Sequence, residues 1–332
     1  MFDFVGKRNW YYLLSFMVLL PGIISLLIPP ALKPGIEFTS GSTMTARFQN
    51  PVSEGDLRAE MSALNHPEAR VQRTGENEYL VRTTELKGTA AQTPELAPPP
   101  MGERQAIEAA LVQKFGPMIN ANGGVVNTFI DYASVSAAVS REIGQKSAIA
   151  VAVAAVAILL YISWAFRSIP NPLRCGIAAT IATMHDVVLV MGAYSILGKV
   201  FNMEVNTMFI TGLLTVIGFS VHDTIVVLDR IRENSMRYPD LHLHQRVNNS
   251  ILQTLSRSIN TSFTVILAVV ALLLIGGVTI RPFLVVMLIG TITGTYSSIF
   301  VASQILVTWE EGDVPRLFRR VFPKRAPVVA DS

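Results

Sequence analysis

Six long runs of apolar residues constrain this chain more than any other feature of its sequence. A bilayer core about 30 Å thick needs about 20 residues of helix to cross it, and a helix satisfies its own backbone hydrogen bonds in lipid. Charged residues make up 15% of the chain, against about 25% in soluble domains. We therefore expect a polytopic α-helical membrane protein with six transmembrane helices. They are Trp10–Pro29, Ser147–Phe166, Cys175–Leu197, Val205–Leu228, Ser258–Ile280 and Pro282–Trp309.

Basic residues in the short flanks predict how these spans are oriented, because cytoplasmic loops are enriched in Lys and Arg. One set of flanks holds most of the basic residues, whereas the opposite short loops hold only Lys199 and Arg281. We expect a multi-pass protein of the cytoplasmic (inner) membrane with both termini cytoplasmic. The net charge of +3 then reports topology and not nucleic-acid binding. Prolines and no cleavage site follow the first run, so we interpret it as an uncleaved span.

Metal and cofactor sites are not expected. The one cysteine, Cys175, can form neither an intrachain disulfide nor a cysteine-based metal site. His242 and His244 are two positions apart and would point to different faces of a helix. His66 stands alone before Pro67, and we interpret it as a loop histidine.

The segment between the first two spans, residues 30–146, is long enough for one small external α+β domain. Alternating runs predict strands, and the spacing of Leu57 and Met61 predicts a helix capped by Ser53. The order β-α-β-β-α-β is a ferredoxin-like arrangement. The Pro-rich residues Gly88–Pro100 indicate a loop or linker. The expected strands are Ser42–Phe48, Ala69–Arg73, Glu78–Thr83 and Val125–Tyr132, and the expected helices are Pro51–Leu64 and Gly102–Phe115.

Three further segments complete the expected organisation. Residues 1–29 hold the cytoplasmic N-terminus and the first span, residues 147–309 hold the other five spans, and residues 310–332 form a basic cytoplasmic tail. A long basic inner loop, residues 229–257, joins the fourth and fifth spans. Within it, Arg246–Leu255 has the pattern of an amphipathic helix lying along the inner membrane face.

Asp223 lies inside the fourth apolar run, where an ionisable side chain is costly and rarely present without a partner or a task. It ends a stripe of small and polar residues on one helix face, made of Gly212, Val216, Ser220 and Asp223. Helix rise places Asp223 about 9 Å inside Asp229. Arg257 opens the next span from the same side, so we expect it to meet Asp223 inside the bundle. Asn260, Thr261, Thr264 and Ala268 share the face of Arg257.

This pairing suggests a proton site. An aspartate beside an arginine stays ionised, and without the arginine burial favours the protonated acid. The residues leave open a static ion pair that only fixes helix packing. Asp186, in the third span, is either a second relay member or a structural hydrogen-bonding group. His185 and His222 each precede an aspartate and point about 100° away around the helix, so they either tune a proton path or pack.

Two aspartates on neighbouring spans also occur in intramembrane aspartyl proteases, whose carboxylates share a proton. The Gly-x-Gly-Asp signature of that class is absent before Asp223, so we do not expect an enzyme. Gly290 and Gly294 form a Gly-x-x-x-Gly pair, which is typical of a helix-contact face.

Several motifs resemble those of the SecF family of protein-export membrane subunits, and together they cover most of the chain. GFSVHDTIVVLDRIREN at Gly218–Asn234 resembles the signature of the fourth span, and TLSRSINTS at Thr254–Ser262 resembles that of the fifth. His185-Asp186-Val187 fits the third span. The segment after the first span resembles the family's Gly-x-Asp-Phe-x-Gly-Gly motif through Gly35, Glu37, Phe38 and Gly41.

The resemblance implies a transporter of the resistance-nodulation-division type that acts with SecD in the Sec pathway. Such a subunit uses the proton gradient to complete preprotein export, and its partners are a SecD-like subunit, the Sec channel, the preprotein and protons. The proton path would map onto Asp223 and Arg257, with Thr261 assisting. The alternative is a proton-coupled small-molecule exporter of the same superfamily, which would need a second external domain and six more spans.

Four features depart from the family pattern. Glu37 stands where Asp is usual, Ser40 where Gly is usual, and His222 where Asn is common. The Pro-rich Gly88–Pro100 stretch resembles an insertion in the external domain.

Overall fold

The computed structural model describes residues 2–86, 102–120, 122–165 and 172–310. The chain forms two compact units, one of Met1–Lys33 with Ile149–Ser332 and one of Pro34–Ala148. Most of the described residues are helical, and the second unit contains a small antiparallel sheet. The expected Gly88–Pro100 loop and all but the first residue of the expected tail, residues 310–332, lie outside the described residues.

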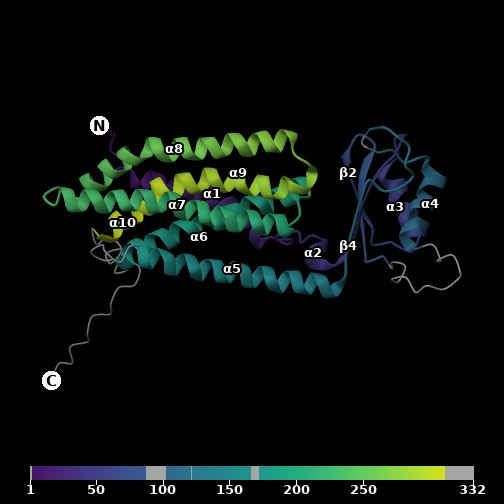
Figure 1. Cartoon of the computed structure of the whole chain (residues 1–332), viewed down its shortest axis with the longest axis horizontal. Helices are drawn as coiled ribbons and strands as arrows, with labels where there is room; N and C mark the ends of the chain where they lie inside the picture. The colour runs from purple at the N-terminus through teal and green to yellow at the C-terminus, as the bar shows by residue number, and fades with distance from the viewer. Residues whose placement is uncertain (1, 87–101, 121, 166–171, 311–332) are drawn as a thin grey trace, which may run out of the picture. The chain divides into compact units, whose positions relative to one another are not determined.

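Long helices build the first unit (Figure 1): α1 (Arg8–Leu27), α6 (Pro172–Phe201), α7 (Thr207–Arg237), α8 (Leu243–Ile275) and α9 (Arg281–Ser297). The 3₁₀ turn η1 (Val278–Ile280) precedes α9, and a π-helical segment, η2 (Ser298–Ala302), joins α9 to α10 (Ser303–Glu310).

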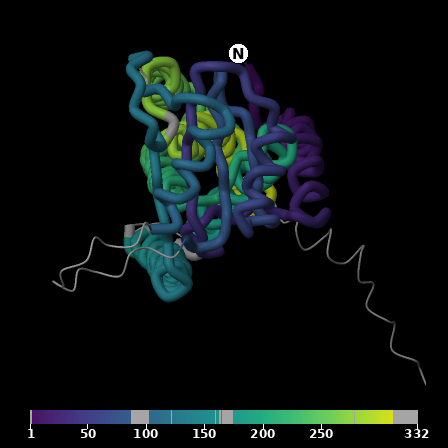
Figure 2. Tube along the Cα trace, turned by 90° about the vertical axis from the view of Figure 1, so that its right-hand side faces the viewer, coloured from purple at the N-terminus to yellow at the C-terminus, as the bar shows by residue number. Residues whose placement is uncertain are grey.

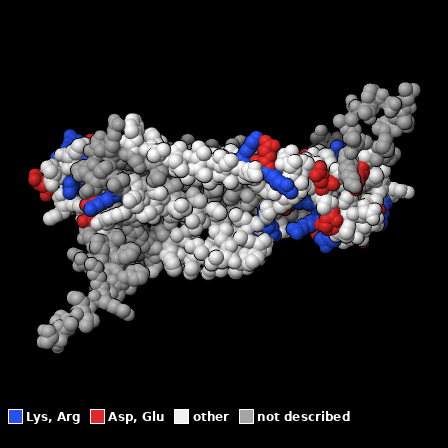
Figure 3. All heavy atoms as spheres, turned by 90° about the horizontal axis from the view of Figure 1, so that it is seen from below, with Lys and Arg blue, Asp and Glu red and all other residues white. Residues whose placement is uncertain are grey.

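Five helical stretches among the described residues are long and apolar enough to cross a membrane. They are Arg8–Leu27, Arg174–Phe201, Thr207–Arg237, Leu243–Ile275 and Arg281–Glu310. The expected span Ser147–Phe166 falls largely in α5 (Ala137–Ala165), which is not among these five. On the face shown in Figure 3, the helices carry a long band of neutral residues, which fits a surface surrounded by lipid.

Glycines let the helices of this unit approach closely. A Cβ added to Gly290 of α9 would lie 2.1 Å from Cγ2 of Val216 on α7. A Cβ added to Gly192 of α6 would lie 2.6 Å from Cα of Gly22 on α1. Carbon atoms in contact are normally about 3.5–4.0 Å apart, so only glycine fits without movement. The predicted contact face around Gly290 is confirmed.

The long inner loop expected between the fourth and fifth spans is mostly helical. α7 continues to Arg237, and α8 already begins at Leu243. The separate surface helix expected over Arg246–Leu255 is therefore wrong, because these residues form the first turns of α8. Val247 and Ile251 are buried in one hydrophobic cluster with residues of α7. The apolar face of the segment packs on α7 and not on the membrane surface.

One antiparallel sheet organises the second unit. After the short helix α2 (Ile36–Thr39), the elements are β1 (Gly41–Arg47), α3 (Glu54–Ala63), β2 (Arg70–Gly75), β3 (Glu78–Thr83), α4 (Glu103–Phe115) and β4 (Asp131–Val135). The strands lie side by side (Figure 2), and their order in the sheet is β2-β3-β1-β4. Met44 on β1 pairs with Val81 on β3 and with Tyr132 on β4.

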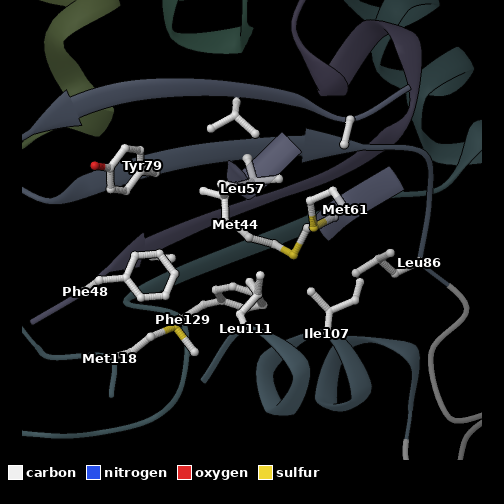
Figure 4. Packing of buried hydrophobic residues seen from close by; sticks show 14 residues of the cluster. Met44, Phe48, Leu57, Met61, Tyr79, Leu86, Ile107, Leu111, Met118 and Phe129 are labelled. Atoms are coloured by element: carbon white, nitrogen blue, oxygen red, sulfur yellow. The ribbon is translucent and has the colours of Figure 1, made fainter. Parts of the chain in front are cut away.

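One face of this sheet forms a core with α3 and α4 (Figure 4). Leu57 and Met61 of α3 point into it, as their spacing predicts. The predicted cap of α3 is confirmed, because the Ser53 hydroxyl accepts a hydrogen bond from the N–H of Gly55 at 3.2 Å. The largest fully buried members of the core are Tyr79, Phe48, Met44, Leu57, Met61, Ile107, Leu111 and Met118.

One expectation, the position of the last strand, fails in the second unit. The last strand is Asp131–Val135 and not Val125–Tyr132. Asn127 has a positive φ of 52°, a left-handed conformation that interrupts an extended backbone. His66 lies between α3 and β2 as expected, but it is only 5% exposed, and its Nδ1 lies 3.0 Å from the Thr83 hydroxyl.

Candidate functional site

Two aspartates lie buried among the helices of the first unit. α7 places Asp223 and α6 places Asp186, which are 2% and 1% exposed. The predicted stripe on α7 is confirmed, since Gly212, Val216, Ser220 and Asp223 are all buried. Burying a carboxylate is costly unless donors or a positive charge compensate it. The surroundings of each aspartate therefore decide what it can do.

Asp186 is surrounded by close donors from three helices. Its Oδ2 accepts hydrogen bonds from the Ser220 hydroxyl of α7 at 2.5 Å and the Ser297 hydroxyl of α9 at 2.6 Å. Its Oδ1 lies 3.0 Å from Nδ1 of His185. Hydrogen bonds to an ionised group are short and strong. Asp186 thus joins α6, α7 and α9 at one point.

Asp223 has fewer and longer contacts. The Ser262 hydroxyl of α8 donates to its Oδ2 at 3.4 Å, and Nδ1 of His222 lies 3.6 Å from its Oδ1. Ser262 itself accepts a hydrogen bond from the Thr295 hydroxyl of α9 at 2.5 Å. Asp223 is therefore buried like Asp186 but is held less firmly.

The face of α8 that meets Asp223 differs from the expected one. Thr261, Asn260 and Thr264 are exposed, and the Thr261 hydroxyl donates to the backbone carbonyl of Arg257 at 2.9 Å. Ser258 and Ser262 are buried instead. The sequence contained a signal for them, because Thr254, Ser258 and Ser262 recur every four residues. The buried stripe of α8 is therefore this one, and not the stripe of Asn260, Thr261 and Thr264 that the sequence analysis predicts.

Arg257 lies outside the buried site. It is exposed and lines a pocket of about 350 Å³ between α7 and α8. Among the described residues no ion pair joins it to Asp223, so the expected meeting of the two is not present in this structure. The pocket is also lined by Ile225, Val226, Asp229, Arg230, Glu233, Gln253 and Thr254.

A second set of hydroxyls lies beside the two aspartates. The Thr224 and Ser298 hydroxyls are 2.9 Å apart, and Ser298 donates to the backbone carbonyl of Ser220 at 3.3 Å. Ser298 opens the π-helical segment η2. Such segments are frequent at functional sites because they locally change helix register.

The motif after the first span makes a turn into β1. Gly35 precedes α2, which carries Glu37 and Phe38, and the Gly35 carbonyl accepts a hydrogen bond from the N–H of Phe38 at 3.0 Å. Ser40 has a positive φ of 62° and Gly41 one of 127°. A Cβ on Gly41 would also lie 2.6 Å from a carbonyl oxygen of β3. The turn therefore requires glycine at the last position of the motif.

In the part of the chain that the structure describes, no group of three His, Cys, Asp or Glu side chains could hold a metal ion. Cys175 is buried and unpaired, so it forms no bridge. The polar side chains around the two aspartates carry hydroxyl and imidazole groups.

Comparison with known proteins identifies the family. Residues 118–312 match the family model described as protein export membrane protein SecD/SecF, C-terminal. Protein translocase subunit SecF of Thermobaculum terrenum is 44% identical over 98% of this chain and 99% of its own length. The SecF subunit of Anaerolinea thermophila is 36% identical over 96% of this chain and 98% of its own length.

A solved structure supports the same family assignment. The crystal structure of SecDF from Thermus thermophilus, a translocon-associated membrane protein, matches with a TM-score of 0.74 at 30% identity. The match covers 93% of this chain but only 39% of SecDF. The chain therefore belongs to the SecD/SecF family of protein translocase subunits.

Proposed function

We propose that this chain is a proton-motive-force-driven subunit that acts with a SecD-like partner to complete preprotein export through the Sec channel. The observation that carries the proposal is Asp223, a carboxyl group 2% exposed in the middle of a membrane-length helix and held only by contacts of 3.4 and 3.6 Å. Intramembrane carboxyl groups mark ion paths by default. Translocase subunits named SecF and SecDF are its relatives.

The proposed architecture has six spans, with α5 supplying the second. Large apolar side chains along α5 are exposed in this unit, among them Ile149, Val153, Val156 and Leu160, which suits a lipid or partner surface. Residues 30–146 form the external domain, and its strand order and antiparallel pairing support a ferredoxin-like arrangement. Both termini, residues 1–29 and 310–332, would be cytoplasmic, as the basic flanks predict.

In the proposed cycle Asp223 alternates between two states. With Arg257 turned inward, the carboxylate is ionised; with Arg257 turned away, burial favours the protonated acid. The exposed Arg257 and the missing ion pair in the described residues support the second state for this structure. Thr261, one turn after Arg257, would guide the guanidinium during this movement. One charge moving across the potential yields about 2.3 kcal/mol per 100 mV.

Asp186 would be the second member of the route. Among the described residues no hydrogen bond joins it to Asp223, but Ser220 on the Asp223 face of α7 donates to it at 2.5 Å. A change at Asp223 that moves α7 would therefore reach Asp186 and, through Ser297, α9. The SecD-like partner would supply the rest of the route, because the matched SecDF chain contains far more than this chain covers.

The proposal is tested with Asp223→Asn in membrane vesicles that carry the assembled translocase. We expect loss of gradient-driven preprotein export with the ATP-driven step intact. The variant should still co-purify with the SecD-like partner, because the amide fills the same space. Normal gradient-driven export by an assembled variant would refute the relay and leave a purely structural role for Asp223.

A further inference from the structure

The two buried aspartates share a local arrangement that their sequence positions did not predict. Each follows a histidine, and each histidine turns its Nδ1 toward the next carboxylate. The distance to Oδ1 is 3.0 Å for His185 and Asp186, and 3.6 Å for His222 and Asp223. Successive helix positions diverge by about 100°, but the imidazole is long enough to bend back along the helix surface.

The two histidines differ in burial. The side chain of His185 is 8% exposed, whereas that of His222 is 64% exposed. Asp223, its neighbour, has a side chain only 3% exposed. His222 therefore extends from the buried carboxyl group to the surface of α7, while His185 stays inside the bundle with Asp186.

An exposed histidine in this helix needs a polar neighbourhood. His222 is seven residues before Asp229, so it lies about 10 Å inside by helix rise. Ionisable side chains at membrane depth face a bundle interior or a water-filled cavity and are rare against lipid. The exposed surface of α7 around His222 is therefore suited to contact with water.

Among the described residues, His222 is also the titratable group that contacts Asp223. α8 contributes Ser262, and α9 reaches the site through Thr295; neither side chain titrates in the physiological range. Asp186 of α6 is engaged by Ser220 and Ser297. Arg257 of α8 lies in the pocket near Asp229, without an ion pair to Asp223 among the described residues.

We propose that His222 transfers protons between the buried Asp223 and the polar surface of α7. In this step the carboxylic acid of Asp223 gives its proton to Nδ1 of His222, directly or through one water. The imidazolium then releases a proton from Nε2 to water, which leaves a carboxylate and a neutral imidazole. Histidine suits the task because it gains and loses its proton between about pH 5 and 8. His185 has no route to the surface and serves to hold Asp186.

The test rests on the proposed function and compares three variants in the assembled translocase: His222→Asn, Asp223→Asn and Thr215→Ala. Asparagine keeps a hydrogen-bonding side chain but cannot titrate. Thr215 is exposed on the same face, two turns before His222, and its hydroxyl donates to the Thr211 carbonyl at 2.8 Å. The measurement is gradient-driven export between pH 5 and 8.5, with the ATP-driven rate as reference.

We expect His222→Asn to slow gradient-driven export by about 100-fold, the lower end of the contribution of a positioned proton-transfer group. We also expect it to remove the inflection in the pH profile, and Thr215→Ala to keep rate and profile. A slow variant with an unchanged pH profile would mean that His222 only positions Asp223, and a normal rate would also overturn the inference. If Asp223→Asn exports normally, the proposed function fails as well.

Water access gives an independent readout. The one native cysteine, Cys175, is buried, so the unmodified chain provides a blank for thiol labelling. We expect a membrane-impermeant maleimide to label His222→Cys in the assembled complex and not His185→Cys. Equal protection of both positions would place His222 away from water and overturn the inference.

Discussion

The contact between α7 and α9 can be tested by adding one methyl group. In Gly290→Ala the new Cβ would lie 2.1 and 2.4 Å from the two methyl carbons of Val216, and 2.8 Å from its Cβ. Normal carbon contacts are about 3.5–4.0 Å, so the helices must separate by roughly 1.5 Å. Overpacking a close contact costs about 1–3 kcal/mol, and we expect the free energy of unfolding to fall by that amount.

The separation would also disturb the aspartates. Ser220 lies one turn after Val216, and Ser297 lies two turns after Gly290; both donate to the same oxygen of Asp186. If α7 and α9 move apart by roughly 1.5 Å to restore a normal carbon–carbon distance, Oδ2 of Asp186 cannot keep its hydrogen bonds to both serines. Gly290→Ala should therefore impair gradient-driven export as well as stability.

Thermal unfolding of the purified chain in detergent measures the first effect. Gly218→Ala on α7 is the matched control, because a Cβ there meets no atom within 4 Å. Alanine is also favoured over glycine in a helix by about 1 kcal/mol, so this control should be neutral or stabilised. Equal unfolding midpoints for Gly290→Ala and Gly218→Ala would refute the close contact.

Two further predictions concern the second unit. Ser40→Gly should stabilise the chain by about 1 kcal/mol in chemical unfolding, because φ 62° and ψ 166° form a conformation that costs a non-glycine residue about 1–3 kcal/mol. Glycine loses part of this gain through the greater flexibility of the unfolded chain. Gly41→Ala should destabilise the chain, and a lower stability of Ser40→Gly would contradict a strained backbone at Ser40. The bond from the Thr83 hydroxyl at 2.7 Å, with a further bond from Thr84, lowers the pKa of Glu68 to about 2. A carboxylate whose folded-state pKa is lowered stabilises the fold above its unfolded value, near 4.5, and that contribution is lost as the pH falls toward 2. Glu68→Gln should remove this dependence in unfolding measured between pH 2 and 6, and an unchanged slope would contradict it.

The features that depend on periodicity could be predicted from the sequence. The buried stripe ending at Asp223 followed from spacings of four, four and three residues, because helix geometry puts such positions on one face. The cap at Ser53 and the core face of α3 followed for the same kind of reason. These predictions rest on short-range geometry, which the local sequence contains.

The features that depend on which tertiary contacts form could not be predicted from the sequence. α8 continues through Arg246–Leu255 because its apolar face finds α7, and an amphipathic pattern does not reveal whether a helix or a membrane covers it. Asn127 stops the expected strand through a backbone conformation that no spacing shows. Ser262 and Thr261 are adjacent hydroxyls, and only the rotation of α8 decides which of them meets Asp223.

The histidines show a third kind of limit. The angle between neighbouring helix positions places His222 away from Asp223, but the side chain bends back to 3.6 Å. Backbone direction alone cannot describe the reach of a long side chain.

The central claim is that Asp223 couples the proton gradient to preprotein export. The most direct measurement is the increase in precursor release when a proton gradient is imposed on vesicles holding the assembled translocase, compared between the unmodified chain and Asp223→Asn. The account predicts that the variant assembles, keeps the ATP-driven rate, and shows no increase when the gradient is imposed. An increase equal to that of the unmodified chain would contradict the claim.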